Sequence, residues 1–462
     1  ATMDIKTVQG RVEHEGESFL TITLPAFAKE FQKTLDKGKV ERHHFSSFGR
    51  KKNGGLPRFL GGFLSLVFDA ESGVLLDEPD IDAILAVRQL TLLFSKYSLR
   101  CSNKREREAM DGFIKCELDI RSCDNSRPDY LLRDFKAVSQ ALFARSFTTV
   151  DRKVYCGEYR PKHGPGATAD HLRGNGKYLQ SAWTARMEKI FPAGENLLPN
   201  WSFFDQLEEV DIQDPGSEIP VRVISVPKTM KTPRIIAIEP TCMQYMQQAI
   251  LPLFLDSFKS DKFLRFALGF NDQTPNQRLA HDGSLSGELA TLDLSEASDR
   301  VSNQLVRAMF ANHPHLHEAV DSCRSRKADV PGHGIIRLAK FASMGSALTF
   351  PIEAMVFLTI VIDAISKELN TSVARTCESL HGRVRIYGDD IIVPVDYVHA
   401  VIGNLEAFGL LVNRDKSFWT GKFRESCGGD YYDGHDISLV RVRQVFPTSR
   451  KQHVSELVAT VS

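Results

Sequence analysis

The chain has 462 residues, of which 42% are hydrophobic and 25% are charged, close to the averages of folded globular proteins. This composition argues against a disordered chain, a collagen-like repeat or a coiled coil. Lysine and arginine together number 58, as do aspartate and glutamate, so the net charge gives no sign of a nucleic-acid partner. Any basic surface must come from local segregation of charge.

The eight cysteines are not closely paired, and a chain of this length needs no disulfides, so we expect a reducing compartment and no structural zinc. The sequence begins ATMDIKTVQG, without a basic region and an apolar core, and we expect no signal peptide. The longest apolar stretch, Ala354 to Ile362, is about half a membrane span and is bounded by Glu353 and Asp363. We expect a buried helix there and no association with a membrane.

The first half of the chain carries little beyond helices with one apolar face. From Asp80 to Tyr97, apolar residues recur at helical spacing after an aspartate that can cap a helix. Basic clusters at Arg42 to Lys52 and at Lys104 to Arg107 can touch phosphate, but a solvated surface is the simpler explanation.

Short β-type runs alternate with helical ones from Val221 onward. VRVISV and RIIAI flank a turn, LATLDL precedes a helix, RVRIY and IIVPV flank a second turn, and LVRVRQVF lies near the end. These patterns predict an α+β fold. Because we find no internal repeat and no low-complexity linker, we expect one body with subdomains.

Two adjacent carboxylates, Asp389 and Asp390, occupy the turn of RVRIYGDDIIVPV. Like charges this close repel each other unless a cation neutralises them, and an exposed turn can present both to a divalent metal. A solvated turn is the alternative, since aspartate and glycine are common in turns.

A further pair of carboxylates lies in LATLDLSEASDRVSNQLV. Asp293 closes an apolar strand and needs a partner there, whereas Asp299 follows one turn later and can simply cap the next helix. Together with the turn aspartates, Asp293 can hold two Mg²⁺ ions, or Mn²⁺, about 3.5 to 4 Å apart for in-line phosphoryl displacement.

Two more segments suit a nucleotide, although each has an ordinary structural explanation. In SMGSALTF, Ser343, Gly345 and Thr349 make a small, polar start to an apolar helix, which lets a substrate backbone approach but also suits a serine cap. Cations surround the turn of VRVISVPKTMKTPRIIAIEP and suit a triphosphate, or are solvated hairpin charges: Arg222, Lys228, Lys231 and Arg234.

The order of these segments resembles the ordered motifs of viral RNA-dependent RNA polymerases. More narrowly, GFNDQTPNQRLAHDGS, DLSEASD, SMGSALTF, YGDDII and FRESCGGDYYDGHD resemble the replicase subunit of the leviviruses, the single-stranded RNA bacteriophages. The clear resemblance runs from Val221 to Asp436. It implies an RNA-directed RNA polymerase that replicates a viral single-stranded RNA genome from nucleoside triphosphates in the bacterial host cytoplasm, releasing pyrophosphate.

The resemblance also implies a role for each matching residue. The metal ligands would be Asp293, Asp389 and Asp390, and Lys416 would donate a proton to the leaving pyrophosphate. The incoming nucleotide would contact Lys228, Arg234, Asp299, Ser343, Gly345 and Thr349, with Asp299 recognising the ribose 2′-hydroxyl. RNA or primer would contact Arg222, Lys231 and Arg424, the last within a primer-gripping hairpin from Phe423 to Gly428.

The implied fold is a right hand of fingers, palm and thumb, with a small antiparallel palm sheet backed by helices. We expect an N-terminal region and fingers over residues 1–284, including the basic hairpin at 221–240, and a palm over 285–422. Residues 423–462 would form the primer grip and the start of a short or truncated thumb. The implied partners are RNA template and product, nucleoside triphosphates, host translation elongation factors and a host RNA-binding ribosomal protein.

Two other functions remain as alternatives. A reverse transcriptase shares the metal site but usually has a bulky side chain near the first catalytic aspartate, whereas Ser295 here is small. A non-catalytic RNA-binding protein would be free to lose its carboxylates, and all three are present. One departure from many eukaryotic-virus polymerases is Glu353, which stands where they carry an asparagine that helps to select ribose.

Overall fold

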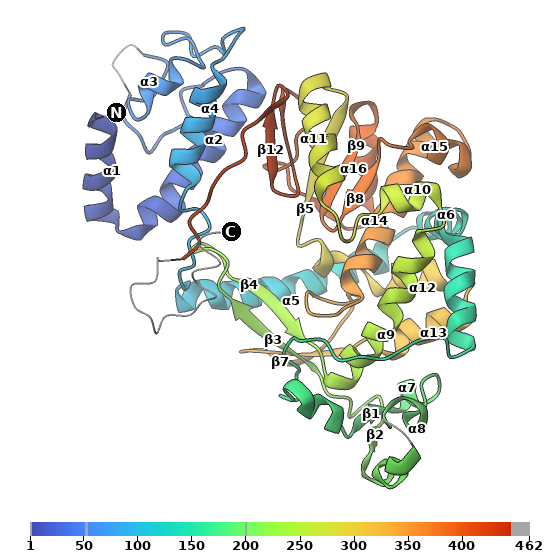
Figure 1. Ribbon diagram of the computed structural model, residues 1–462. Coiled ribbons are helices and arrows are strands. Elements are labelled where there is room, and N and C mark those ends of the chain that lie inside the picture. The colour runs from blue at the N-terminus through green and yellow to red at the C-terminus, as the bar shows by residue number, and fades with distance from the viewer. Residues whose placement is uncertain (1, 51–53, 199–200, 445–462) are drawn as a thin grey trace.

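The N-terminal helices form a group at one side of the molecule (Figure 1). The computed structural model describes residues 2–50, 54–198 and 201–444. The group contains α1 (Thr2–Glu15), a π-helix (Phe19–Thr23), α2 (Leu24–Lys37), α3 (Gly61–Leu64) and α4 (Ile81–Leu92). Asp80 caps α4 by accepting a hydrogen bond of 2.7 Å from the Ala83 backbone N–H, so the predicted cap and helix are confirmed.

A large hydrophobic core joins most of the remaining helices. The remaining longer helices are listed here, and of these α5 and α11 contribute no residue to that core: α5 (Asn103–Ser126), α6 (Asp129–Tyr155), α9 (Thr241–Phe258), α10 (Lys262–Ala267), α11 (Thr274–Ser286), α12 (Asn303–Phe310), α13 (Pro314–Ser322), α14 (Thr349–Glu368), α15 (Val373–Ser379) and α16 (Val398–Ala407). Among the described residues, α14 alone is long and apolar enough to cross a membrane, and 94% of that window is buried inside the protein. The predicted buried helix is confirmed.

The central sheet is small and entirely antiparallel. Its strand order is β10 (Leu411–Val412), β5 (Leu289–Ser295), β9 (Asp390–Pro394) and β8 (Arg385–Tyr387). Helices α14 and α16 pack together, α14 contacts β8 and α16 contacts β10. The predicted α+β class and the small antiparallel sheet backed by helices are therefore confirmed.

A second sheet carries the basic hairpin. Its order is β4 (Arg234–Ile238), β3 (Val221–Val226), β6 (Lys327–Val330) and β7 (Gly334–Arg337). The pair β3–β4 is the predicted hairpin, and β6 joins β3 in parallel. A smaller parallel pair, β1 (Ala182–Thr184) and β2 (Asp211–Gln213), lies with α7 (Ala185–Glu188) and α8 (Ala193–Asn196). Short 3-10 helices lie at Gly174–Leu179, Trp201–Glu209, Ser298–Arg300 and Val395–Tyr397.

The third sheet contains β11 (Phe423–Ser426), β12 (Gly429–Tyr432) and β13 (His435–Asp436), and it stands between the N-terminal helices and the central sheet (Figure 1). Phe418, Phe423, Tyr432 and Ile437 share one hydrophobic cluster with the N-terminal helices. Residues from the two ends of the chain thus form one packed unit.

The strand predicted for LVRVRQVF is wrong over its described residues, 439–444. This segment is extended but joins no sheet, because its backbone hydrogen bonds go to the end of α4 and the residues after it. The Val442 N–H donates to the Leu93 carbonyl and the Ser98 N–H donates to the Arg443 carbonyl, each at 2.8 Å. Its last two residues, 445 and 446, lie outside the described residues.

All eight cysteines are free thiols.

Candidate active site

The central sheet brings two of the predicted metal ligands face to face. Asp293 in β5 and Asp390 at the start of β9 are register partners on adjacent antiparallel strands. Asp389 directly precedes Asp390 and is exposed on the turn between β8 and β9. That turn requires glycine at Gly388, because its φ is +59° and a Cβ there would lie 2.6 Å from the Phe350 ring.

The negative charges of these carboxylates repel one another. Burial, followed by the charge of Asp389, raises the pKa of Asp390 to about 7, although the Cys427 backbone N–H donates a 3.1 Å hydrogen bond to its Oδ2. Burial and Asp389 also raise the pKa of Asp293, against the opposing effect of Lys416. Raised pKa values in neighbouring acids indicate a site that a cation would stabilise in its ionised form.

Asn413 and Lys416, which follow β10, both contact the Asp293 carboxylate. The Asn413 side chain donates to Asp293 Oδ2 at 2.9 Å, and Lys416 Nζ lies 3.4 Å from the same oxygen. Partial burial lowers the pKa of Lys416, but Asp293 and Glu425 raise it more, so the net shift is upward. Lys416 is thus a protonated amine at the edge of the carboxylate group.

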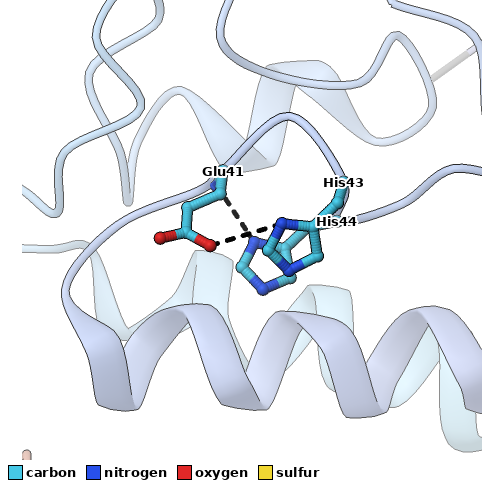
Figure 2. Close-up of side chains that lie close together, drawn as sticks. All are labelled: Glu41, His43 and His44. Atoms are coloured by element: carbon cyan, nitrogen blue, oxygen red, sulfur yellow. Dashed lines mark hydrogen bonds and ion pairs between the residues drawn. The ribbon is translucent and has the colours of Figure 1, made fainter.

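The three aspartates offer hard oxygen ligands, which suit Mg²⁺ or Mn²⁺. Among the described residues, however, the one group of three His, Cys, Asp or Glu whose ligand atoms all lie within 4.8 Å is elsewhere: Glu41, His43 and His44 in the N-terminal region (Figure 2). The aspartates would have to come closer together to share an ion. In the Glu41 loop, His44 Nδ1 already accepts a 3.0 Å hydrogen bond from the Glu41 backbone N–H.

Three of the predicted nucleotide-binding residues meet beside the aspartates. The Ser343 hydroxyl donates to Asp299 Oδ1 at 2.8 Å, and the Thr349 hydroxyl donates to the Ser343 carbonyl at 2.9 Å. Asp299 does not cap the next helix, because the Ser302 hydroxyl does so by accepting a 3.0 Å bond from the Gln304 N–H. The Asp299 side chain therefore belongs to this pocket and not to the helix N-terminus.

Gly345 joins this pocket to the basic hairpin. Its φ is +135°, and a Cβ on it would lie only 1.9 Å from the Ala237 carbonyl oxygen in β4. The Ala237 N–H donates a 2.9 Å hydrogen bond to the Met344 carbonyl. Only glycine permits so close a contact between the two segments.

The hairpin places Lys228 within electrostatic reach of the aspartates. Burial lowers the pKa of Lys228, Arg234 and Lys416 lower it further, and Asp389 and Asp293 oppose them. Arg234 and Lys231 are exposed on the same hairpin. Arg222 is half-buried in β3, and its Nε has no hydrogen-bond partner among the described residues.

The predicted primer contact of Arg424 is wrong for its side chain, which is 0% exposed. Its Nε donates to the Leu289 carbonyl at 2.6 Å and its Nη1 to the Phe423 carbonyl at 2.7 Å. Burial lowers the pKa of Arg424 to about 10. The guanidinium fixes the third sheet to β5 and cannot reach a strand of RNA.

Sequence analysis missed Lys340, which donates a 3.0 Å hydrogen bond to Asp299 Oδ1. A lysine inside the otherwise apolar LAKFAS was the available signal.

Glu353 is buried beside Gly388, with no partner for its Oε2 among the described residues. Burial, then the charges of Asp389 and Asp299, raise its pKa well above the usual range.

Comparisons with known proteins match the half of the chain in which these residues lie. The family model described as RNA replicase, beta-chain matches residues 217–451. The RNA-directed RNA polymerase beta chain of Enterobacteria phage fr is 38% identical over 48% of this chain and 37% of its own length, and that of Escherichia phage MS2 is 37% identical over the same shares. The beta subunit of Escherichia virus Qbeta is 36% identical over 48% of this chain and 35% of its own length.

The chain matches little more than a third of the length of these relatives. A solved BmCPV RNA-dependent RNA polymerase at elongation state gives a TM-score of 0.38 at 11% identity, over 65% of this chain and 28% of that one, a likeness too weak to bear on function. The family model covers just over half of the chain and contains all three aspartates, Lys416 and the Ser343 pocket. The predicted resemblance is confirmed: the chain belongs to the RNA replicase beta-chain family.

Proposed function

We propose that this chain is an RNA-directed RNA polymerase that replicates the single-stranded RNA genome of a bacteriophage. The observation that carries the proposal is the pairing of Asp293 with Asp390 on adjacent strands, with Asp389 on the turn beside them. Relatives that share this region are named RNA-directed RNA polymerases.

The chain's own residues account for the chemistry required. The three aspartates would hold Mg²⁺ or Mn²⁺, which when bound would neutralise charge and favour ionisation of the attacking hydroxyl. Lys228 and Arg234 bind the triphosphate of the incoming nucleotide. Lys416, a protonated amine beside Asp293, gives its proton to the leaving pyrophosphate.

In this proposal Asp299 selects ribonucleotides over deoxyribonucleotides. Its Oδ1 accepts hydrogen bonds from Ser343 and Lys340, whereas no described residue donates to its Oδ2. A ribose 2′-hydroxyl can donate to that free oxygen and a deoxyribose cannot. This selection favours a replicase over a reverse transcriptase.

The remaining expectations follow from family membership. We infer a right-hand arrangement in which residues 221–240 belong to the fingers, 285–422 are the palm and the hairpin from Phe423 contacts the primer through residues other than Arg424. The partners are template and product RNA and nucleoside triphosphates, together with host translation elongation factors and an RNA-binding ribosomal protein. The site of action is the cytoplasm of the bacterial host.

The test is incorporation of labelled ribonucleotides and deoxyribonucleotides by the purified chain on an RNA template with Mg²⁺, with and without bacterial lysate. Asp389→Asn should abolish ribonucleotide incorporation while leaving the fold and RNA binding intact. Asp214→Asn, at another exposed aspartate, is the matched control. Equal incorporation by Asp389→Asn and the unmodified chain would overturn the metal assignment, and dependence on lysate would indicate host subunits.

A further inference from the structure

Three adjoining pockets form a groove outside the candidate active site, between α7, α12, α13 and the β6–β7 hairpin. Their volumes are about 420, 230 and 330 Å³, and Arg326 lines all three. Arg337 is shared by the first and second pockets, and Arg307 by the second and third. The shared walls make the three pockets one continuous feature, which we call the arginine groove.

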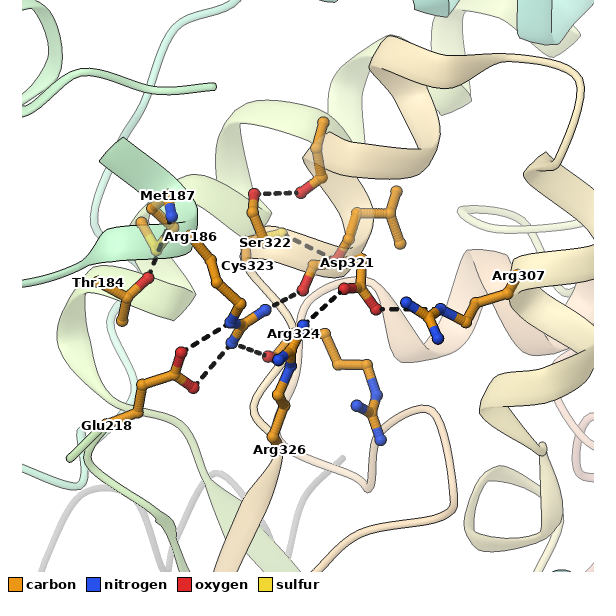
Figure 3. A network of polar contacts seen from close by, with 12 residues as sticks. Thr184, Arg186, Met187, Glu218, Arg307, Asp321, Ser322, Cys323, Arg324 and Arg326 are labelled. Carbon is orange, nitrogen blue, oxygen red and sulfur yellow. Dashed lines mark hydrogen bonds and ion pairs between the residues drawn. The ribbon is translucent and has the colours of Figure 1, made fainter. Parts of the chain in front are cut away.

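The middle pocket of the arginine groove has an excess of positive charge. Four arginines line it, against the single carboxylate of Asp321: Arg307, Arg324, Arg326 and Arg337. Figure 3 shows the network around this carboxylate. Asp321 lies 2.9 Å from Arg326 Nη2 and 3.6 Å from Arg307 Nε. Burial raises the pKa of Asp321, but Arg307 and Arg326 lower it more, so the net shift is downward. One carboxylate is thus shared by two guanidinium groups.

Two arginines of this region are fully engaged in holding the fold. Arg186 forms a two-pronged ion pair with Glu218 at 2.7 and 2.8 Å. Arg324 is buried and donates to the carbonyls of Phe341 and Lys340 at 2.7 and 2.6 Å. Their charges raise the local potential, but most of their donors already bind protein oxygens.

The other cations of the groove have donors to spare. Arg307 and Arg337 are exposed, and within the described part of the chain Arg337 makes no ion pair. Among the described residues Arg326 makes one side-chain hydrogen bond, to Asp321, although a guanidinium carries five N–H donors. Lys189 is exposed in the third pocket, where Glu318 is the additional acid. Guanidinium donors that the protein does not use match the oxygens of phosphate.

We propose that the arginine groove binds the phosphodiester backbone of single-stranded RNA, at a site separate from the nucleotide pocket. Three joined pockets with an arginine at each junction suit a chain of phosphates better than a single one. Ile190, Ile335 and Ile336 provide aliphatic surface at the two ends, where sugars or bases can pack. The choice of RNA over another polyanion rests on the proposed function.

The groove wall continues into the nucleotide pocket along the chain. The carbonyls that Arg324 holds belong to the segment from Leu338 to Phe341, which leads directly to Ser343. RNA seated in the groove would therefore lie against the same segment that orients Asp299.

The test is the affinity of a fluorescein-labelled oligouridylate, measured by anisotropy over a series of salt concentrations. In the double variant Arg307→Gln/Arg337→Gln, loss of two phosphate contacts should weaken binding about 10-fold and reduce the salt slope by about 1.4, since each single-stranded phosphate contact contributes about 0.7. The matched control is Arg133→Gln/Arg145→Gln, which removes two exposed arginines from α6.

Equal affinities and slopes in the groove and control variants would overturn the proposal, as would equal losses in both. Thermal melting of each variant checks that the fold is retained. Asp389→Asn separates the two proposals, because it should lose incorporation and keep oligouridylate binding. A groove that binds RNA in a chain that incorporates nothing would uphold the groove and refute the polymerase.

Discussion

Lys340 Nζ lies 3.0 Å from Asp299 Oδ1 and 3.4 Å from Glu117 Oε1, in a site where the lysine side chain is 0% exposed. Its Nζ also stands 3.6 Å from the centre of the Phe113 ring. Burial lowers the pKa of Lys340, but Asp299 and Glu117 together raise it more. One buried ammonium thus connects α5 to the carboxylate that we assign to ribose recognition.

Lys340→Met should destabilise the protein strongly, because it leaves Glu117 buried without its counter-ion. Removal of one member of a buried ion pair costs about 3–5 kcal/mol. Lys259→Met, which breaks an exposed pair with Asp256, should cost less than about 1 kcal/mol. Urea unfolding of both variants measures the difference. Similar small losses in the two variants would mean that Lys340 contributes little to holding Asp299.

Gly345→Ala should disrupt the contact between the Ser343 segment and β4. The new methyl group would fall 1.9 Å from the Ala237 carbonyl, at a φ of +135° that alanine avoids. We expect a loss of at least about 1–3 kcal/mol in unfolding free energy and a large loss of incorporation. Gly403→Ala, inside α16 with nothing within 4 Å, should instead stabilise by up to about 1 kcal/mol. A neutral Gly345→Ala would show that this contact is dispensable.

The central sheet could be predicted from sequence because its signals are local. Alternating runs around Asp293 and Asp390 define the strands, and the turn glycine fixes the hairpin between them. The facing of these two aspartates then follows from antiparallel pairing. The role of Lys340 could not be predicted, because its partner Glu117 is far away in the sequence and only tertiary packing brings them together.

The burial of Arg424 also could not be predicted from the sequence. An arginine in a hairpin near the active site is as consistent with RNA contact as with burial, and composition does not distinguish the two. The deciding fact is that the third sheet packs against both β5 and the N-terminal helices. That contact joins the two ends of the chain, for which no local sequence signal exists.

Glu239 should make stability depend on pH. It is buried, accepts a 2.5 Å hydrogen bond from Ser325, and burial raises its pKa from 4.5 to about 7. The folded protein therefore keeps a proton that the unfolded chain releases between these values. The unfolding free energy should fall by roughly 3 kcal/mol as pH rises through this window and then level off.

Glu239→Gln should make this dependence shallower, because the amide stays neutral at every pH while other buried acids with raised pKa values, such as Asp390, still contribute. Glu78→Gln, at an exposed glutamate, should leave the pH profile as it is. Urea unfolding from pH 4.5 to 8 measures each profile. A slope as steep in Glu239→Gln as in the unmodified chain would mean that Glu239 does not contribute to it.

Lys228→Ala should mainly weaken use of the nucleoside triphosphate. Lys228 interacts electrostatically with Asp389 and Asp293, whereas the charge of Lys231 on the same hairpin acts on Asp415. Loss of one charge-assisted hydrogen bond, about 1.5–3 kcal/mol, predicts a KM for nucleotide raised roughly 10- to 100-fold. Lys231→Ala should change that KM far less, since the Lys231 charge acts on Asp415 and not on the candidate metal ligands. Steady-state incorporation at varied nucleotide concentration gives the KM of each variant. If the two variants raised KM equally, Lys228 would be one of several solvated hairpin charges, and the triphosphate would have to be bound by Arg234 or Lys416.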